Sequence, residues 1–319
     1  MRHPKPVIIL TGFLGVGKTT LLNAILRHQK KHRFAIIENE IGEISIDSEL
    51  IINNTGSFTE LSNGCICCSI NNNLIDTLRT LSKRGDWDVL IIEATGVANP
   101  GGIILPFKQL PWTQKYFQLP NVICIVDAQN VEKQLKVSDT SASQLAYSDK
   151  IYLNKTDLVS NDQLKQTQIA LQKINPFSRL FFGNKNEIPI DGLIKKSDSL
   201  KPIIQFATPI NTHQNDLKHD HFDAISLNYN IPFDENKLFS RLHTFLVAQS
   251  VSVYRFKGIF YDPRKEKKLI IQSVMQSLHI EEGKQWTNDE LKESKFVFIG
   301  KNLLEKGFDR MLKNCQYKP

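Results

Sequence analysis

Long apolar runs are missing from this 319-residue sequence. No stretch approaches the roughly 18 consecutive apolar residues that a membrane-spanning helix requires. The first apolar segment, Val7–Leu10, is too short to be the hydrophobic region of a secretory signal peptide. We therefore predict a cytoplasmic protein without a transmembrane helix and without a membrane partner.

Arginine-rich stretches, basic runs interleaved with aromatic residues, repeats and low-complexity tracts are also absent. The formal net charge is +7, but the basic residues are spread along the chain, which is typical of a lysine-rich solvated surface. A protein that binds nucleic acid would concentrate this charge on one stripe or patch. Nucleic acid is therefore not among the predicted partners, although some of the charge could serve a polyphosphate ligand.

Cysteine is scarce, with five residues in the chain. Three of them lie together at Cys65, Cys67 and Cys68, whereas Cys124 and Cys315 are isolated. An odd number of cysteines with local clustering argues against a disulfide framework. The pattern favours thiolates that serve metal or redox chemistry.

The chain is longer than a single hydrophobic core usually fills, so two domains are expected. In residues 1–200, short β-branched runs alternate with helix-spaced segments, which indicates right-handed βαβ units. We predict an α/β domain of the P-loop NTPase class, with a mainly parallel sheet flanked by helices. Its expected strands are 7–11, 34–37, 89–92, 122–126, 151–153 and 179–182.

The remainder of the chain has a different texture. Residues 201–221 are polar and contain prolines and the spaced histidines His213, His219 and His221, so they are predicted to be a linker. Residues 222–319 mix alternating runs with helical spacing, which predicts a smaller C-terminal α+β domain. Two strand-like runs on either side of Asp262–Arg264 are expected to form a hairpin.

A phosphate-binding motif lies between the first expected strand and the first expected helix. Gly12–Thr19 matches the pattern GxxxxGK[ST], in which glycines permit a tight turn and backbone N–H groups face the phosphates. Lys18 should reach the β- and γ-phosphates, and the Thr19 hydroxyl should bind magnesium. The residues predicted to hold the nucleotide phosphates are Gly12, Gly15, Val16, Gly17, Lys18, Thr19 and Thr20.

A second motif, Asn154–Asp157, indicates which base is bound. The Asp157 carboxylate can accept hydrogen bonds from the N1–H and N2–H₂ groups of guanine, whereas adenine offers no such donor pair. Asn154 can bond the base edge, and the stem of Lys155 can cover the ring face. The sequence therefore predicts a guanine nucleotide, GTP or GDP, and hydrolysis of GTP.

A third element, Ile91–Gly96, ends a buried strand with an acidic residue. Glu93 could orient magnesium through water or polarise the attacking water, and the Gly96 N–H could contact the γ-phosphate. We expect Lys18, Thr19, Glu93 and Gly96 to be the catalytic group. Which residue activates the water stays open.

The cysteine cluster follows Asn63-Gly64, and three thiols within four residues can place two or three sulfurs on one ion. Zn²⁺ and Co²⁺ both accept such ligands. A structural zinc site would normally show a second Cys or Cys/His pair, and none lies nearby. A redox dithiol and ordinary buried cysteines are the alternatives.

Three carboxylates, Glu38, Glu40 and Glu43, lie just after the second expected strand, where P-loop GTPases carry the switch that senses the γ-phosphate. They could serve magnesium, a transition metal or both, or form a solvated acidic loop. The linker histidines could be weak metal ligands or simply exposed side chains.

These motifs, in this order, resemble the CobW-type metallochaperone GTPases of the SIMIBI class. Ile37–Asp47 looks closest to the YjiA-like branch of that family, and Arg255–Gly258 and Val297–Gly300 resemble its C-terminal landmarks. The resemblance covers nearly the whole chain. One departure is Ile41, which stands where an aromatic residue is usual. Another is the linker, whose spaced histidines replace the His-rich run of some members.

The resemblance implies GTP hydrolysis at Gly12–Thr19 and a Zn²⁺ or Co²⁺ site at Cys65, Cys67 and Cys68. In the YjiA-like branch, the positions of Glu38 and Glu43 are also implicated in metal binding. We therefore expect a metallochaperone that binds a transition-metal ion, with zinc favoured over cobalt as the identity of that ion, and passes it to a client metalloprotein, with a possible nucleotide-dependent homodimer. The alternatives are a regulatory P-loop GTPase and a metal-storage or redox module in which the cysteines are not coupled to hydrolysis.

Overall fold

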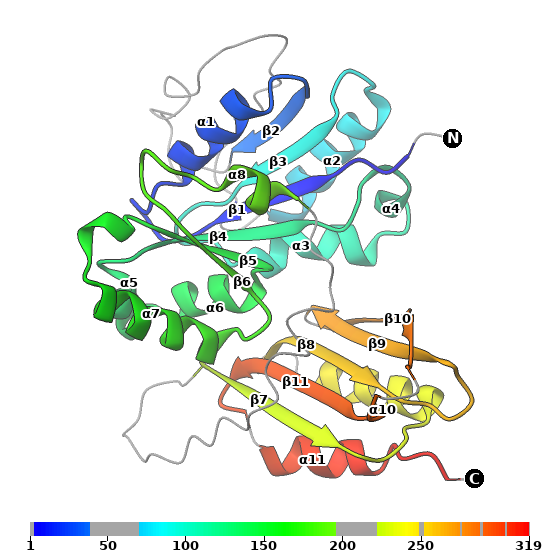
Figure 1. The fold of residues 1–319 in the computed structure, drawn as a ribbon. Coiled ribbons are helices and arrows are strands. Elements are labelled where there is room, and N and C mark those ends of the chain that lie inside the picture. The colour runs from blue at the N-terminus through cyan, green and yellow to red at the C-terminus, as the bar shows by residue number, and fades with distance from the viewer. Residues whose placement is uncertain are drawn as a thin grey trace. The chain divides into compact units, whose positions relative to one another are not determined.

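The computed structural model describes residues 3–38, 70–195, 222–248, 252–274, 276–287, 290–303 and 305–318 (Figure 1). The chain divides into two compact units. The first comprises Met1–Ala170 and Ser178–Ser197, and the second comprises Leu171–Phe177 and Asp198–Pro319. The boundaries at 200 and 221 that the sequence suggested stay predictions, because they fall outside the described residues.

The first unit contains a six-stranded sheet in the order β2-β3-β1-β4-β5-β6, and every neighbouring pair is parallel. This confirms the expected mainly parallel sheet. Both faces of the central strands are buried, which explains their unbroken apolar sequences. The strands are β1 (Val7–Thr11), β2 (Phe34–Glu38), β3 (Val89–Glu93), β4 (Asn121–Asp127), β5 (Lys150–Asn154) and β6 (Arg179–Phe182).

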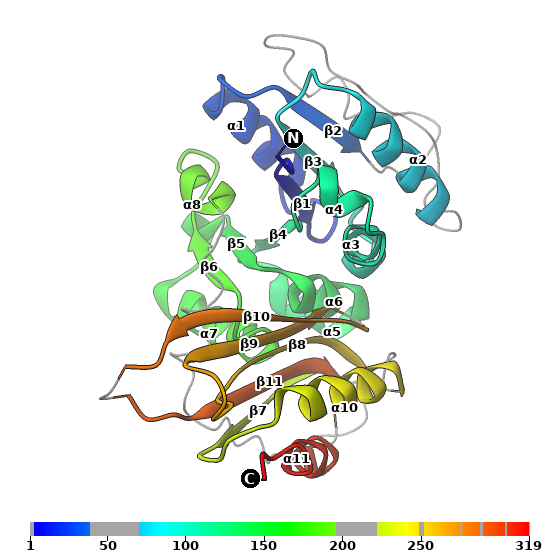
Figure 2. The same cartoon turned by 90° about the vertical axis from the view of Figure 1, so that its right-hand side faces the viewer.

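Helices cover both faces of this sheet. Figure 2 shows α1 and α8 on one side of the strands and α2 and α3 on the other. Leu21, Leu22 and Ile25 of α1 join Leu193 of α8 in one buried cluster with strand residues such as Ile91. The helices are α1 (Lys18–His28), α2 (Ile70–Lys83), α3 (Pro100–Gln109), α4 (Thr113–Tyr116), α5 (Val131–Val137), α6 (Asp139–Tyr147), the short 3₁₀ helix η2 (Thr156–Leu158), α7 (Asn161–Ile174) and α8 (Ile190–Ile194).

The carboxyl ends of the parallel strands bring distant polar residues to one edge of the sheet. Glu38 at the end of β2 is in register with Glu93 at the end of β3. Asp127 at the end of β4 is in register with Asn154 at the end of β5. Thr11 ends β1 between these two pairs and leads into the phosphate-binding motif. In open α/β sheets, this edge is where ligands bind.

The second unit contains a five-stranded antiparallel sheet in the order β10-β9-β8-β11-β7. The hairpin expected around Asp262–Arg264 is confirmed as β8 and β9. The sequence did not predict β10, whose side chains are mostly polar and either partly buried or exposed. The elements are β7 (Phe222–Tyr229), α10 (Glu235–Ala248), β8 (Val253–Phe260), β9 (Lys267–Val274), β10 (Ser277–Gln285), β11 (Ser294–Lys301) and α11 (Glu305–Lys313).

Aromatic packing fills the core of the second unit. Helices α10 and α11 both lie on one face of its sheet (Figures 1 and 2). Leu238 and Leu242 of α10 pack into one buried cluster with phenylalanines of β8 and β11, among them Phe256 and Phe298, whose ring centroids are 4.5 Å apart. Burial of such side chains is worth about 1.5–3 kcal/mol each, so this face holds the unit together.

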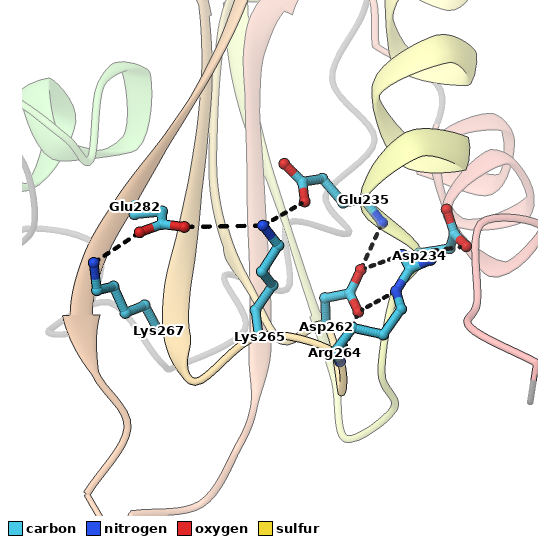
Figure 3. Close-up of polar contacts among 7 residues, drawn as sticks. All are labelled: Asp234, Glu235, Asp262, Arg264, Lys265, Lys267 and Glu282. Atoms are coloured by element: carbon cyan, nitrogen blue, oxygen red, sulfur yellow. Dashed lines mark hydrogen bonds and ion pairs between the residues drawn. The ribbon is translucent and has the colours of Figure 1, made fainter.

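A buried carboxylate joins the β8–β9 turn to the start of α10 (Figure 3). Asp262 accepts hydrogen bonds from the Glu235 N–H at 3.0 Å and from the Arg264 guanidinium at 2.9 and 2.6 Å. Asp234 caps the same helix by accepting from the Lys237 N–H at 2.9 Å. Burial alone would raise the pKa of Asp262, but the hydrogen bonds from Arg264 and Glu235 outweigh it and lower that pKa.

From the sequence we expect no transmembrane helix and a cytoplasmic location. In the ranges that the structure covers, every helix lacks either the length or the apolar character that crossing a bilayer demands. The cytoplasmic location stays a prediction.

Candidate functional site

The loop between β1 and α1 depends on two glycines. Gly12 has a φ of 140°, and a Cβ atom there would lie 2.2 Å from the backbone oxygen of Ile125 in β4. Gly17 has a φ of 104°, and a Cβ atom there would lie 2.7 Å from Nδ2 of Asn154. Both positions combine positive φ with close neighbours, so they admit only glycine. The loop thus presents bare backbone next to β4 and β5.

The first turn of α1 is suited to an anion. Gly17 precedes the helix in a left-handed conformation without a side-chain cap, and the first turn contains no acidic residue. Its N–H groups and the positive end of the helix dipole therefore favour negative charge. Lys18 folds back so that its Nζ donates to the carbonyl oxygens of Gly12 and Phe13, each at 3.0 Å. A bound phosphate could replace these carbonyl oxygens as the hydrogen-bond acceptor of the Lys18 ammonium group.

The predicted magnesium ligand lies beside the predicted acidic residue. The Thr19 hydroxyl donates to Oε1 of Glu93 at 3.2 Å, across 74 residues of sequence. Hydroxyl and carboxylate oxygens are the hard donors that Mg²⁺ prefers, so this pair fits the ion. Since Glu38 is in register with Glu93, the end of β2 lies next to this pair.

Gly96 lies against the phosphate-binding loop. A Cβ atom there would be 2.7 Å from the backbone nitrogen of Leu14 and 2.6 Å from its side chain. The buried amide of Gln144 in α6 donates to the carbonyl oxygens of Gly96 at 3.1 Å and Ala98 at 3.3 Å. Gln144 thereby holds the carbonyl side of Gly96, the Gly96–Val97 peptide, and no local sequence pattern indicated this role.

The guanine motif contacts the phosphate-binding loop directly. Nδ2 of Asn154 donates to the carbonyl oxygen of Val16 at 2.9 Å, and its Oδ1 accepts from the Lys155 N–H at 2.9 Å. Lys155 has a φ of 60°, which is uncommon for a residue with a side chain. Asp157 lies in η2 with an exposed side chain, where its carboxylate can reach a base.

Asp127 is a site residue that the sequence did not single out. It is buried at the end of β4, and its Oδ2 lies 2.8 Å from the Nζ of Lys155. That Nζ also lies 3.4 Å from the carbonyl oxygen of Gly15. Burial opposes the charge of Asp127, but the hydrogen bonds from Lys155 and Asn130 prevail and lower its pKa. Its place beside the Asn154 motif, at the end of the neighbouring strand, was the one available signal.

Some of the remaining predicted site residues lie within the described ranges, and others lie outside them. Val16 is buried beneath the loop, and Thr20 is exposed on α1. The proposed transition-metal ligands Cys65, Cys67, Cys68 and Glu43 lie outside the described residues, as do the linker histidines His213, His219 and His221. Their roles stay predictions. Glu38 is described and partly buried at the carboxyl end of β2.

The two described cysteines are poor metal ligands. Cys124 and Cys315 are buried, and burial raises the pKa of their thiols to about 12 and about 11. Metal coordination requires the thiolate form. Within the described ranges, no three side chains of His, Cys, Asp or Glu gather in a way that could hold an ion.

Two protein-family models and a curated relative match this chain over most of its length. The nucleotide-binding domain of CobW/HypB/UreG proteins matches residues 6–182, and the C-terminal domain of cobalamin synthesis protein cobW matches residues 222–316. The zinc chaperone YjiA of Escherichia coli is 33% identical over 316 residues, covering 95% of this chain and 96% of its own length.

Another relative and a solved structure are also similar to this chain over nearly its whole length. The zinc-regulated GTPase metalloprotein activator 1 of Schizosaccharomyces pombe is 27% identical, covering 94% of this chain and 83% of its own. The crystal structure of the Zn(II)-bound YjiA GTPase from E. coli superposes with a TM-score of 0.74 at 27% identity and covers 99% of this chain and 100% of that one. The chain therefore belongs to the CobW/HypB/UreG family and is a P-loop GTPase that carries a cobW-type C-terminal domain.

Proposed function

We propose that this GTPase is a metallochaperone that binds a transition-metal ion, zinc in preference to cobalt, at Cys65, Cys67 and Cys68. Glu38 and Glu43 would complete or assist the ligand set. The GTP or GDP state would control transfer of the ion to a client metalloprotein. Two observations from the comparisons support the metal: several relatives carry the name zinc chaperone, and a solved relative holds Zn(II).

The observation that carries the coupling is the contact between β2, β3 and α1. Glu93 accepts from Thr19, the predicted magnesium ligand, and Glu38 is its neighbour across the sheet. In the sequence, Glu38 directly precedes the segment that holds Glu43 and the cysteines. A change at the Thr19–Glu93 pair would therefore act on Glu38, which lies at the start of the proposed metal-binding segment.

The nucleotide would be held by groups from three loops. The N–H groups of Gly12–Thr19 and the Lys18 ammonium would bind the phosphates, while Asp157 would accept from guanine. Magnesium, held by Thr19 with Glu93 nearby, would neutralise charge on the β- and γ-phosphates. These contacts keep the reacting γ-phosphate in place and favour charge as it develops on the leaving oxygen.

Hydrolysis would then act as the timing step. Water attacks the γ-phosphorus, the bond to the β–γ bridging oxygen breaks, and GDP and inorganic phosphate form. The Gly96 N–H would lose its γ-phosphate contact. Loss of this contact would relax the neighbouring acidic segment and weaken the metal site, which releases the ion.

A nucleotide-dependent homodimer is part of the same proposal. Leu14 and Val97 are 61% and 45% exposed although both are large and apolar, and they belong to two loops of the nucleotide site. Exposed apolar residues at a functional edge are typical of interaction surfaces. Sedimentation in GDP and in a non-hydrolysable GTP analogue tests this: a larger species in the analogue alone supports it, and an unchanged monomer contradicts it.

The function is tested by comparing two cysteine variants. Cys67→Ala should weaken zinc binding and leave GDP affinity nearly unchanged, because the thiol serves the metal alone. Cys124→Ala is the matched control in the same unit: its thiol is buried and protonated, so zinc binding should stay normal. Zinc affinity is measured against a competing chelator, and GTP turnover with and without zinc. Loss of zinc and GDP binding together in Cys67→Ala would instead indicate a structural site.

A further inference from the structure

The buried carboxylate of Asp127 divides its two oxygens between different tasks. Oδ1 accepts from the Gln129 N–H at 2.9 Å and so shapes the turn that follows β4. Oδ2 accepts from Nδ2 of Asn130 at 3.1 Å and from the Nζ of Lys155 at 2.8 Å. Oδ1 therefore serves the turn alone, whereas Oδ2 is shared between Asn130 of the turn and the lysine of the Asn154–Asp157 motif.

Lys155 needs an external constraint. Its backbone has a φ of 60°, which directs the side chain away from the path of β5 and over the phosphate-binding loop. The side chain is 35% exposed, whereas that of Asp127 is 4% exposed. A long lysine stem with so much solvent around it would sample many rotamers if nothing held its end. Asp127 supplies the buried, ionised anchor.

We propose that Asp127 is a positioning residue for the nucleotide base: it fixes Lys155 so that the lysine stem forms one wall of the guanine pocket. The inference rests on the proposed role of Lys155 at the base. Asp127 acts through Lys155 and does not touch the nucleotide itself. Since Nζ also contacts the Gly15 carbonyl, the same ion pair ties the base loop to the phosphate loop.

The chemistry of the carboxylate makes asparagine a sharp substitution. Three donors, on Gln129, Asn130 and Lys155, converge on the two oxygens of Asp127. In Asp127→Asn, one of these oxygens becomes an NH₂ group. Either orientation of the amide then sets a donor against a donor. The orientation that keeps the hydrogen bond from the Gln129 N–H faces the amide NH₂ toward Lys155 and Asn130, and it releases the lysine.

The test is a double-mutant cycle in the full-length protein, with Asp127→Asn, Lys155→Met and the double variant. Affinity for GDP is measured by titration, and GTP turnover gives KM and kcat. Each single variant should weaken GDP binding about tenfold, the order expected for losing one charge-assisted contact. The double variant should be about as weak as Lys155→Met alone. KM for GTP should rise by a similar factor with kcat unchanged, because the base contact does not change during reaction.

Asp149→Asn is the matched control. Asp149 lies at the opposite end of β5, where its carboxylate accepts from the Val122 N–H at 3.0 Å. This variant should keep GDP affinity whatever it does to stability. Thermal unfolding of every variant separates loss of fold from loss of affinity, because a purely structural Asp127 would lower the melting temperature with or without Lys155.

Two results overturn the inference in different ways. If Lys155→Met weakens binding but Asp127→Asn does not, or if the double variant is about a hundredfold weaker, Asp127 does not act through Lys155. If Lys155→Met itself binds GDP as the wild type does, Lys155 is no part of the base pocket. That second result contradicts the assigned role of Lys155 in the guanine site, and the inference falls with it.

Discussion

Substitution of the loop glycines by alanine gives the most discriminating check of the site geometry. Gly15 has a φ of 72° but no heavy atom within 4 Å of an added Cβ. Gly15→Ala should therefore cost only the left-handed backbone penalty, about 1–2 kcal/mol. It serves as the reference because it shares the loop and the sign of φ with the other positions.

Gly17→Ala should cost more than this reference. Its Cβ would lie 2.7 Å from Nδ2 of Asn154 and would push that amide away from the Val16 carbonyl, 2.9 Å distant. Loss of a buried hydrogen bond adds about 1–3 kcal/mol to the backbone penalty. The variant should also bind GDP more weakly, because it displaces Asn154, the residue predicted to bond the base edge.

Gly12→Ala should be the most damaging change. Its Cβ would meet the Ile125 carbonyl oxygen at 2.2 Å, and this oxygen belongs to the backbone of β4, which cannot move aside like a flexible side chain. A clash with a central strand belongs to the mechanisms that cost more than about 4 kcal/mol. We expect a variant that is poorly folded in the first unit or binds no GDP.

The assay is urea unfolding with a GDP titration on each variant. Gly307→Ala in α11 is the outside control: it has no positive φ and no atom within 4 Å, so it should raise stability by about 0.5–1 kcal/mol. The predicted order of damage is Gly12, then Gly17, then Gly15. Equal losses at Gly12 and Gly15, or normal GDP affinity in Gly12→Ala, would refute the reasoning.

Three further predictions concern other described residues. Asp262→Asn should destabilise the second unit by about 1.5–3 kcal/mol, since it breaks charge-assisted hydrogen bonds. Folding lowers the pKa of Asp262, so the gap in unfolding free energy between wild type and variant is full above the pKa of the unfolded chain, near 3.9, and closes as the pH falls through the folded pKa. Urea unfolding across pH 2–7 would measure this gap. A constant gap would contradict it. Gln144→Leu should slow GTP hydrolysis about tenfold at unchanged GDP affinity, because it frees the Gly96–Val97 peptide and loosens the loop that carries Gly96; single-turnover kinetics check this, and normal hydrolysis would count against it. Cys124 and Cys315 should resist alkylation by iodoacetamide at pH 8 in the folded protein and react on unfolding, since their pKa values are raised to about 12 and about 11; mass spectrometry reads the result, and rapid native labelling of either would be inconsistent with their burial.

Much of the first unit could be predicted because parallel strands leave a strong mark on sequence. Runs such as Val7–Thr11 and Lys150–Asn154 are buried on both faces, and each ends in a recognisable motif. Once the sheet is parallel, all strand ends meet at one edge. The contact between Asn154 and the phosphate-binding loop follows from that rule and a pair of local patterns.

The helices between Gly96 and Tyr147 were missed for local reasons. Helix α3 begins with Pro100-Gly101-Gly102 and has Pro106 in its interior, so its intrinsic helix propensity is poor. It forms because Asn99 caps its first turn and because six of its residues are buried. Burial against neighbouring elements outweighed propensity, and no pattern within the segment shows what those neighbours are.

Site residues that act through tertiary contacts could not be predicted. Asp127 meets Lys155 across 28 residues, and Gln144 meets Gly96 across 48. Neither belongs to a motif with fixed spacing, because each supports a motif residue from a neighbouring element. Their partners become evident only when strand register and helix placement are known.

We expect nucleotide state and metal binding to be coupled through the Thr19–Glu93 pair and the adjoining end of β2. The most direct measurement is a zinc titration against a competing chelator in the presence of a non-hydrolysable GTP analogue and, separately, of GDP. Zinc should bind about 5–150-fold more tightly with the analogue than with GDP. By linkage, zinc should raise the affinity for the analogue relative to GDP by the same factor. Equal zinc affinities in the two nucleotide states would contradict it.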